Sequence, residues 1–233
     1  MVKWMKKLAL LLCSAAFLTA GLSALSEGGT VIACVGDSIT YGVIPNTPGK
    51  QTNRNYPAVL AEHLGEGFEV LNFGKPGSSL TEKGVCYRNR DGYPLSLEAK
   101  AQVYIIMLGT NDANKDAEWD ARLFESDLKD MVDAYREANP DAAIFLMAPP
   151  AVFPNTATGE TAMNVDMLGG EIRKIVQDVA EEKQAGYIDL FAETEGHPEW
   201  FVGDGIHPTD EGYEAIGGIV YESVKDTAAK ANG

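Results

Sequence analysis

The sequence has little of what binds a metal or an organic cofactor. Its 233 residues include only three cysteines and three histidines, which form no spaced metal-ligand cluster. It also has no His-Glu-x-x-His zinc helix, no Walker-type phosphate loop, no Gly-x-Gly-x-x-Gly after a strand and no Gly-x-Ser-x-Gly elbow. We therefore expect no metal and no organic cofactor.

Internal repeats and low-complexity tracts are also absent, which argues against a solenoid or a long disordered tail. A chain of this length with 45% hydrophobic residues can bury one substantial core. We expect a single domain over residues 27–233.

Basic residues are scarce: 19 stand against 34 acidic ones, for a formal charge of −15. Three of the lysines lie in the first seven residues, so removal of that segment would leave −18. Such a surface repels phosphate backbones and anionic lipid. We expect no nucleic-acid partner and no stable membrane association, and a neutral substrate fits better.

The first 26 residues have the pattern of a secretory signal peptide. Lys3, Lys6 and Lys7 precede an apolar run over 8–25 that ends in small residues. A retained membrane anchor is the alternative. Cys13 follows Leu12, a poor residue for lipoprotein processing, so we expect export to the periplasm, the cell surface or the medium.

Cys34 and Cys86 are the two cysteines that remain after such processing. Cys34 lies within an apolar run, where a small buried hydrophobe is its simplest role. A Cys34–Cys86 disulfide after export is the alternative.

The mature chain alternates between predicted strands and helices. Short apolar, β-branched runs at 30–35, 68–73, 103–108, 143–148 and 186–190 predict five strands. Helical periodicity follows them, as at Phe124, Leu128 and Val132. Crossover helices imply an α/β fold with a mainly parallel five-stranded sheet covered on both faces, and a doubly wound sheet would have the order 2-1-3-4-5.

Polar motifs follow the ends of these strands. Ser38 comes directly after the first strand, where a hydroxyl would be exposed. A serine needs a base to become a nucleophile, and His207 is the candidate, with Asp204 three residues earlier to orient its imidazole. Asp189, at the end of the fifth strand, is the rival carboxylate.

An acyl-transfer intermediate carries an oxyanion that needs preorganised donors. The backbone N–H groups of Ser38 and Gly77 and the side-chain amide of Asn111 are the candidates. Asp37 and Asp112 would repel an oxyanion if they faced it, so we expect both to point away and to accept backbone N–H groups.

Four blocks carry a resemblance to a known family: GDSIT (36–40), NFGKPG (72–77), GTND (109–112) and DGIHP (204–208). Together, in this order and spacing, they resemble the SGNH, or GDSL-type, serine hydrolases and esterases over roughly residues 30–226. The resemblance implies a flavodoxin-like three-layer α/β/α sandwich, with Ser38 as nucleophile, His207 and Asp204 completing a triad, and Ser38, Gly77 and Asn111 forming the oxyanion hole.

Substrate choice is expected to lie in the loops over 43–55 and 83–94. Sugars stack on aromatic rings and arginine binds hydroxyls or carboxylates, so Tyr87, Arg88, Tyr93 and Trp200 are candidate substrate contacts. An ordinary ordered loop is the alternative.

The predicted function is that of a secreted serine esterase that forms an acyl-enzyme and removes O-acetyl groups from carbohydrate. A lysophospholipase or thioesterase of longer acyl specificity is the first alternative. A non-catalytic carbohydrate-binding module on the same fold is the second.

Overall fold

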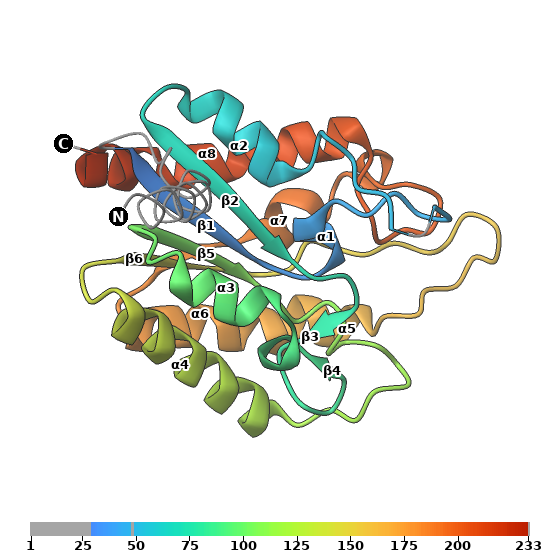
Figure 1. Cartoon of the computed structure of the whole chain (residues 1–233). Coiled ribbons are helices and arrows are strands. Elements are labelled where there is room, and N and C mark those ends of the chain that lie inside the picture. Colours follow the sequence, from blue (N-terminus) through green and yellow to red (C-terminus); the bar gives the residue numbers. More distant parts are fainter. Residues whose placement is uncertain (1–28, 48, 233) are drawn as a thin grey trace, which may run out of the picture.

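The computed structural model describes residues 29–47 and 49–232. The predicted signal peptide over 1–26 lies outside these described residues. A five-stranded parallel sheet has the order β2-β1-β5-β6-β7, which confirms the predicted doubly wound order of the five main strands. Helices cover both of its faces (Figure 1), so the expected three-layer α/β/α architecture is confirmed.

The sheet strands end at nearly the same level. They are β1 (Thr30–Gly36), β2 (Phe68–Gly74), β5 (Val103–Met107), β6 (Ala143–Met147) and β7 (Gly186–Ile188). Gly36 at the end of β1 pairs with Gly74 of β2 on one side and with Met107 of β5 on the other. The three loops that leave these strands therefore begin side by side, where the winding direction changes.

The helices follow the apolar periodicity of the sequence. On one face of the sheet lie α2 (Tyr56–Leu64) and α8 (Asp210–Asn232); on the other lie α4 (Ala121–Ala138) and α6 (Arg173–Glu182), as Figure 1 shows. Shorter elements complete the chain: α1 (Ser38–Tyr41), η1 (Tyr87–Asn89), α3 (Gly92–Glu98), α5 (Val165–Met167), η2 (Leu168–Ile172), α7 (Leu190–Thr194) and η3 (Pro198–Trp200).

Alternating residues of each central strand pack into two separate cores. Cys34 and Ile105 pack against α2 and α8, whereas Val35 and Ile106 pack against α4 and α6. All five residues of β5 are buried, as expected of a strand covered on both faces. Because both faces of β1 and β5 are packed, the positions of the carboxyl ends of these strands are fixed.

Three details differ from the sequence-based expectation. The irregular stretch 83–94 contains the start of α3, and Ser78–Ser79 (β3) and Val85–Cys86 (β4) form a small parallel pair. The chain enters α6 through the π-helical turn η2, which the helical periodicity does not predict; there a Cβ on Gly169 would lie 2.4 Å from the ring of Phe191. Such local packing is set by distant residues.

Cys34 and Cys86 are both buried and free, so the disulfide alternative is wrong. Cys86 lies on β4, and its thiol donates to the Leu80 carbonyl at 3.3 Å. Among residues 29–47 and 49–232, no helix is long and apolar enough to cross a membrane.

Candidate active site

Ser38 is the first residue of α1, two residues after β1 ends. Asp37 caps this short helix: its carboxylate accepts the Ile39 N–H at 2.9 Å. The first N–H groups of a helix have no partner within it, so the Ser38 N–H is not used by the hydrogen bonds of α1. The strand end and the cap thus present both the hydroxyl and the amide of one residue at the edge of the sheet.

His207 reaches Ser38 from a loop 169 residues later. Its Nε2 lies 2.9 Å from Ser38 Oγ, and its Nδ1 lies 2.8 Å from Asp204 Oδ2. The other oxygen of Asp204 accepts the N–H groups of Ile206 and His207 at 2.8 and 2.9 Å. The Asp204 carboxylate therefore stabilises the turn that contains it through Oδ1, and it orients the imidazole through one hydrogen bond at Oδ2.

The environment keeps Asp204 ionised. Partial burial raises the pKa of its carboxyl, but hydrogen bonds from the His207 ring and from the two backbone N–H groups outweigh it, so the pKa lies below its usual value. An ionised carboxylate at Nδ1 places the proton there and leaves Nε2 free to accept one from Ser38. This arrangement can activate a serine hydroxyl.

Asp189 does not compete for the imidazole. Its Oδ2 accepts from the Arg173 guanidinium at 2.6 Å, and its Oδ1 accepts the Ala192 N–H at 3.4 Å as the N-cap of α7. Of the two carboxylates considered from the sequence, Asp204 is therefore the one beside His207.

Gly77 and Asn111 lie on the two neighbouring loops. Gly77 is exposed in a turn with φ +76°, a conformation that suits glycine. The Asn111 amide donates to the Ser78 carbonyl at 2.9 Å and lies 3.4 Å from Asp37 Oδ2. The second contact is long for a hydrogen bond, so one Asn111 N–H is only weakly engaged and is free to meet another acceptor.

Asp37 and Asp112 both accept backbone N–H groups, as expected, but neither lies at the surface. Burial raises the pKa of Asp37 to about 6, although the Ile39 N–H opposes this. Asp112 accepts from the N–H groups of Leu80 and Thr81 and from the Thr81 hydroxyl at 2.8–3.0 Å. It thereby ties the loop of Asn111 to the loop of Gly77, a role that the sequence-based interpretation missed.

Of the four predicted substrate contacts, the structure contradicts Tyr87. Tyr87 is fully buried, and its hydroxyl donates to the Phe73 carbonyl at 2.8 Å. Arg88 donates to the Asp127 carbonyl at 2.7 Å, and Tyr93 packs edge-on against Tyr87. Tyr87 faces the core because the 83–94 segment continues into α3 and covers the sheet, so its ring offers no open face to a sugar. Arg88 and Tyr93 are half-buried, and a substrate contact through their remaining surface stays a prediction.

Trp200 is half-buried and stacks on His197, with the ring centroids 3.8 Å apart and the planes 6° apart. One face of its ring is therefore covered. Its carbonyl accepts the Thr209 N–H at 2.8 Å, which helps to position the loop that carries His207. A substrate contact through its remaining surface stays a prediction.

Three of the hollows in the part of the chain that the structure describes lie beside the loops of the site. One of about 570 Å³ lies between the 43–53 loop and residues 202–213. A second of about 550 Å³ lies on the other side of the 43–50 loop, against Tyr41, Lys75 and Arg90. A third of about 330 Å³ is lined by Gly77 and Asn111 together with small side chains. Val43 and Ile44 line the first two hollows, so this loop separates them.

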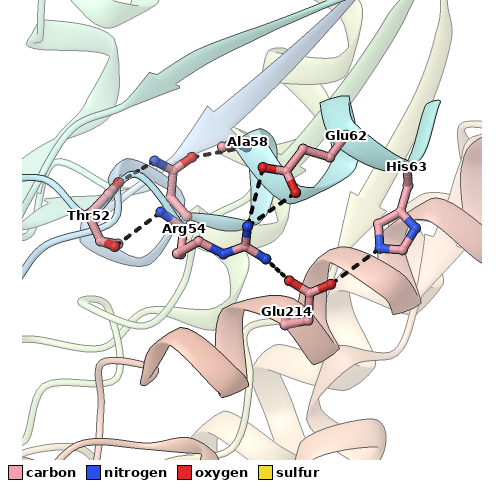
Figure 2. Close-up of polar contacts among 7 residues, drawn as sticks. Thr52, Arg54, Ala58, Glu62, His63 and Glu214 are labelled. Carbon is pink, nitrogen blue, oxygen red and sulfur yellow. Dashed lines mark hydrogen bonds and ion pairs between the residues drawn. The ribbon is translucent and has the colours of Figure 1, made fainter. Parts of the chain in front are cut away.

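Directly after the 43–53 loop, Arg54 anchors the chain through ion pairs. Figure 2 shows the Arg54 guanidinium between Glu62 of α2 and Glu214 of α8. His63 lies 3.7 Å from the other oxygen of Glu214, and Thr52 accepts the Arg54 N–H at 3.1 Å. The network joins two helices and fixes where the loop returns to the body of the protein.

Comparison with known proteins identifies the family. The model of the GDSL-like lipase/acylhydrolase family matches residues 34–215, which is more than half of the chain. The chain is 30% identical over 226 residues to an acetylxylan esterase of Xylanibacter ruminicola, covering 88% of this chain. It spans 45% of that relative's length.

Solved structures share the fold. A carbohydrate acetylesterase family member from Sinorhizobium meliloti superimposes with a TM-score of 0.70 at 21% identity, over 86% of this chain and 99% of that one. A lipase/acylhydrolase from Enterococcus faecalis gives 0.68 at 21% identity, over 85% and 96%. The motif blocks, the sheet order and the matched family agree: the chain belongs to the GDSL-like lipase/acylhydrolase family.

Proposed function

We propose that the protein is an exported O-acetylesterase of carbohydrate, with Ser38 as nucleophile, His207 as general base and acid, and Asp204 as the group that orients the imidazole. The observation that carries the proposal is the hydrogen-bonded chain from Ser38 Oγ through His207 to Asp204. Export rests on the leader pattern over 1–26.

The proposed reaction has two halves. Ser38 Oγ attacks the ester carbonyl while His207 Nε2 takes its proton, and the oxyanion is met by the N–H groups of Ser38 and Gly77 and the Asn111 amide. The intermediate collapses, the alcohol leaves with the proton from His207, and an acyl-Ser38 ester remains. Water then attacks this ester with His207 again as base, and the second collapse releases the acid and restores Ser38.

A short acyl group and a sugar are favoured by separate observations. The hollow beside Gly77 and Asn111 is the smallest of the three and is lined mainly by small or polar side chains. The similar chains include an acetylxylan esterase and a carbohydrate acetylesterase. The acidic surface disfavours nucleic acid and anionic lipid as partners.

Three assays test the proposal. Purified protein should release acetate from acetylated xylo-oligosaccharides and hydrolyse p-nitrophenyl acetate faster than the octanoate, since the small hollow suits a short chain. Ser38→Ala should lower both activities by more than about 10³-fold, because the nucleophile is lost. Preference for octanoate would contradict acetyl specificity and favour a lysophospholipase or thioesterase, and unchanged hydrolysis by Ser38→Ala would contradict the nucleophile.

A further inference from the structure

We propose that the hollow beside α1 binds a carboxylate-bearing sugar next to the acetylated one, so that the substrate is an acidic acetylated saccharide. This inference rests on the proposed esterase function and narrows its substrate. Lys50, Lys75 and Arg90 line this hollow of about 550 Å³ together with Tyr41.

The charge of the hollow is opposite to that of the protein. The chain carries a formal charge of −15, yet three cations and one acid, Asp91, line this surface. Within the part of the chain that the structure describes, neither Lys50 nor Arg90 makes an ion pair. Two uncompensated cations in an acidic protein attract an anionic ligand to this place, and arginine can bind a carboxylate with two parallel hydrogen bonds.

Lys75 is held in place before any ligand arrives. Its ammonium lies 3.0 Å from Asp91 Oδ1, and its side chain is only 25% exposed. The stem crosses Gly92 so closely that a Cβ there would lie 2.8 Å from two of its carbons. A cation with a fixed position loses little side-chain entropy when it binds an anion.

Two residues that line the hollow are close in the sequence to residues of the reaction centre. Tyr41 ends the four-residue helix that begins at Ser38, and Pro76 directly precedes Gly77. Tyr41 is half-buried, and an aromatic face of this kind can pack against a sugar ring. One sugar can therefore occupy the hollow while its neighbour presents an ester to Ser38.

The hollow on the other side of the loop has the opposite charge. It is lined by Asp210 and Glu211, and Asp210 also accepts from the Thr52 hydroxyl at 3.1 Å. Ile44, which is 38% exposed, lies between the two hollows. A carboxylate is repelled from the hollow of Asp210 and Glu211 and attracted to the hollow of Lys50 and Arg90. This difference would orient an acidic oligosaccharide across the active site.

The test compares two substrates of different charge. Acetate release is measured from acetylated oligogalacturonates, which carry carboxylates, and from acetylated xylo-oligosaccharides, which do not. We expect Lys50→Gln/Arg90→Gln to lower the ratio of kcat/KM for the acidic over the neutral substrate about tenfold, chiefly through KM. Lys100→Gln/Lys230→Gln is the matched control and should leave the ratio unchanged, because both residues are exposed, Lys100 just before β5 begins and Lys230 near the end of α8, away from the carboxyl ends of the strands.

A binding experiment separates this inference from the esterase assignment. In the Ser38→Ala background, unacetylated oligogalacturonate should bind by calorimetry, more weakly with added salt and about tenfold more weakly after Lys50→Gln/Arg90→Gln. Equal losses on both substrates, or no salt-sensitive binding, would overturn the inference while p-nitrophenyl acetate hydrolysis still stood. Binding of a sugar phosphate but not of the uronate would also overturn it.

Discussion

Asp37 shows how the first strand serves the site residue by residue. It is fully buried beside Ser38, caps α1 and lies 3.4 Å from the Asn111 amide. Few N–H groups reach this carboxylate, so burial raises its pKa from 3.8 to about 6. The residue that shapes the nucleophile's turn is therefore a source of instability at neutral pH.

Asp37→Asn should relieve that instability in a pH-dependent way. Because the pKa of Asp37 is raised in the folded state, the folded protein binds the proton more tightly, and wild-type stability falls as pH rises from about 4 through 6. The free energy of unfolding of the variant relative to wild type should therefore increase by about 2–3 kcal/mol between pH 4 and pH 8. Denaturant titrations at both values measure this, and a pH-independent difference would contradict it.

Asn111→Ala should lower kcat by about 10²–10³-fold with little change in KM, because an oxyanion donor acts mainly in the transition state. Initial rates on p-nitrophenyl acetate measure it. Asn89→Ala, an exposed amide elsewhere, is the matched control. A rise in KM at unchanged kcat would instead assign Asn111 to ground-state binding.

The local motifs made the residues of the proposed triad predictable from the sequence. Ser38 follows a strand, and the spacing of Asp204 and His207 lets one turn join them. Tyr87 and Arg88 were not predictable in the same way, since an aromatic or basic residue in an irregular stretch has no pattern that separates core from surface. Their burial depends on how α3 packs on the sheet.

At the scale of elements, the equal ends of β1, β2 and β5 gather the loops of Ser38, Gly77 and Asn111. This arrangement was predictable, because buried apolar strands alternate with amphipathic helices along the sequence. The π-helical turn η2 and the short pair β3 and β4 were not, because each is fixed by contacts between segments far apart in the chain. The connection between the loops of Gly77 and Asn111 through Asp112 was not predictable for the same reason.

Asp112→Asn should loosen that connection. The new NH₂ group would face either the Leu80 N–H or the two donors of Thr81, so at least one buried donor would lose its acceptor. We expect kcat to fall about tenfold and KM to change little, because Gly77 and Asn111 would no longer be held in register. Asp130→Asn, on an exposed position of α4, is the control, and equal kcat values for the two variants would show that Asp112 does not position the site.

At the scale of the whole molecule, two cores on the two faces of one sheet support the active-site edge, and no disulfide links residues within 29–47 and 49–232. Both described cysteines are buried, and burial raises the pKa of Cys34 to about 12. A thiol of that kind stays protonated and unreactive.

Reductant should therefore leave the stability unchanged. The Tm measured with and without dithiothreitol should agree within about 1 °C, since a disulfide would contribute about 2–4 kcal/mol and several degrees. Cys86→Ser tested under oxidising conditions is a second check, because its Tm should not depend on reductant either. A fall in Tm of the wild type on reduction would show that the two cysteines pair.

The most direct test of the central claim is covalent labelling with a fluorophosphonate, followed by mass spectrometry of the peptides. The account predicts one phosphonylated residue, Ser38, and labelling about 10³-fold slower in His207→Ala, because the imidazole activates the hydroxyl. A stable adduct on another serine, or full esterase activity after Ser38 is labelled, would contradict the assignment of the nucleophile.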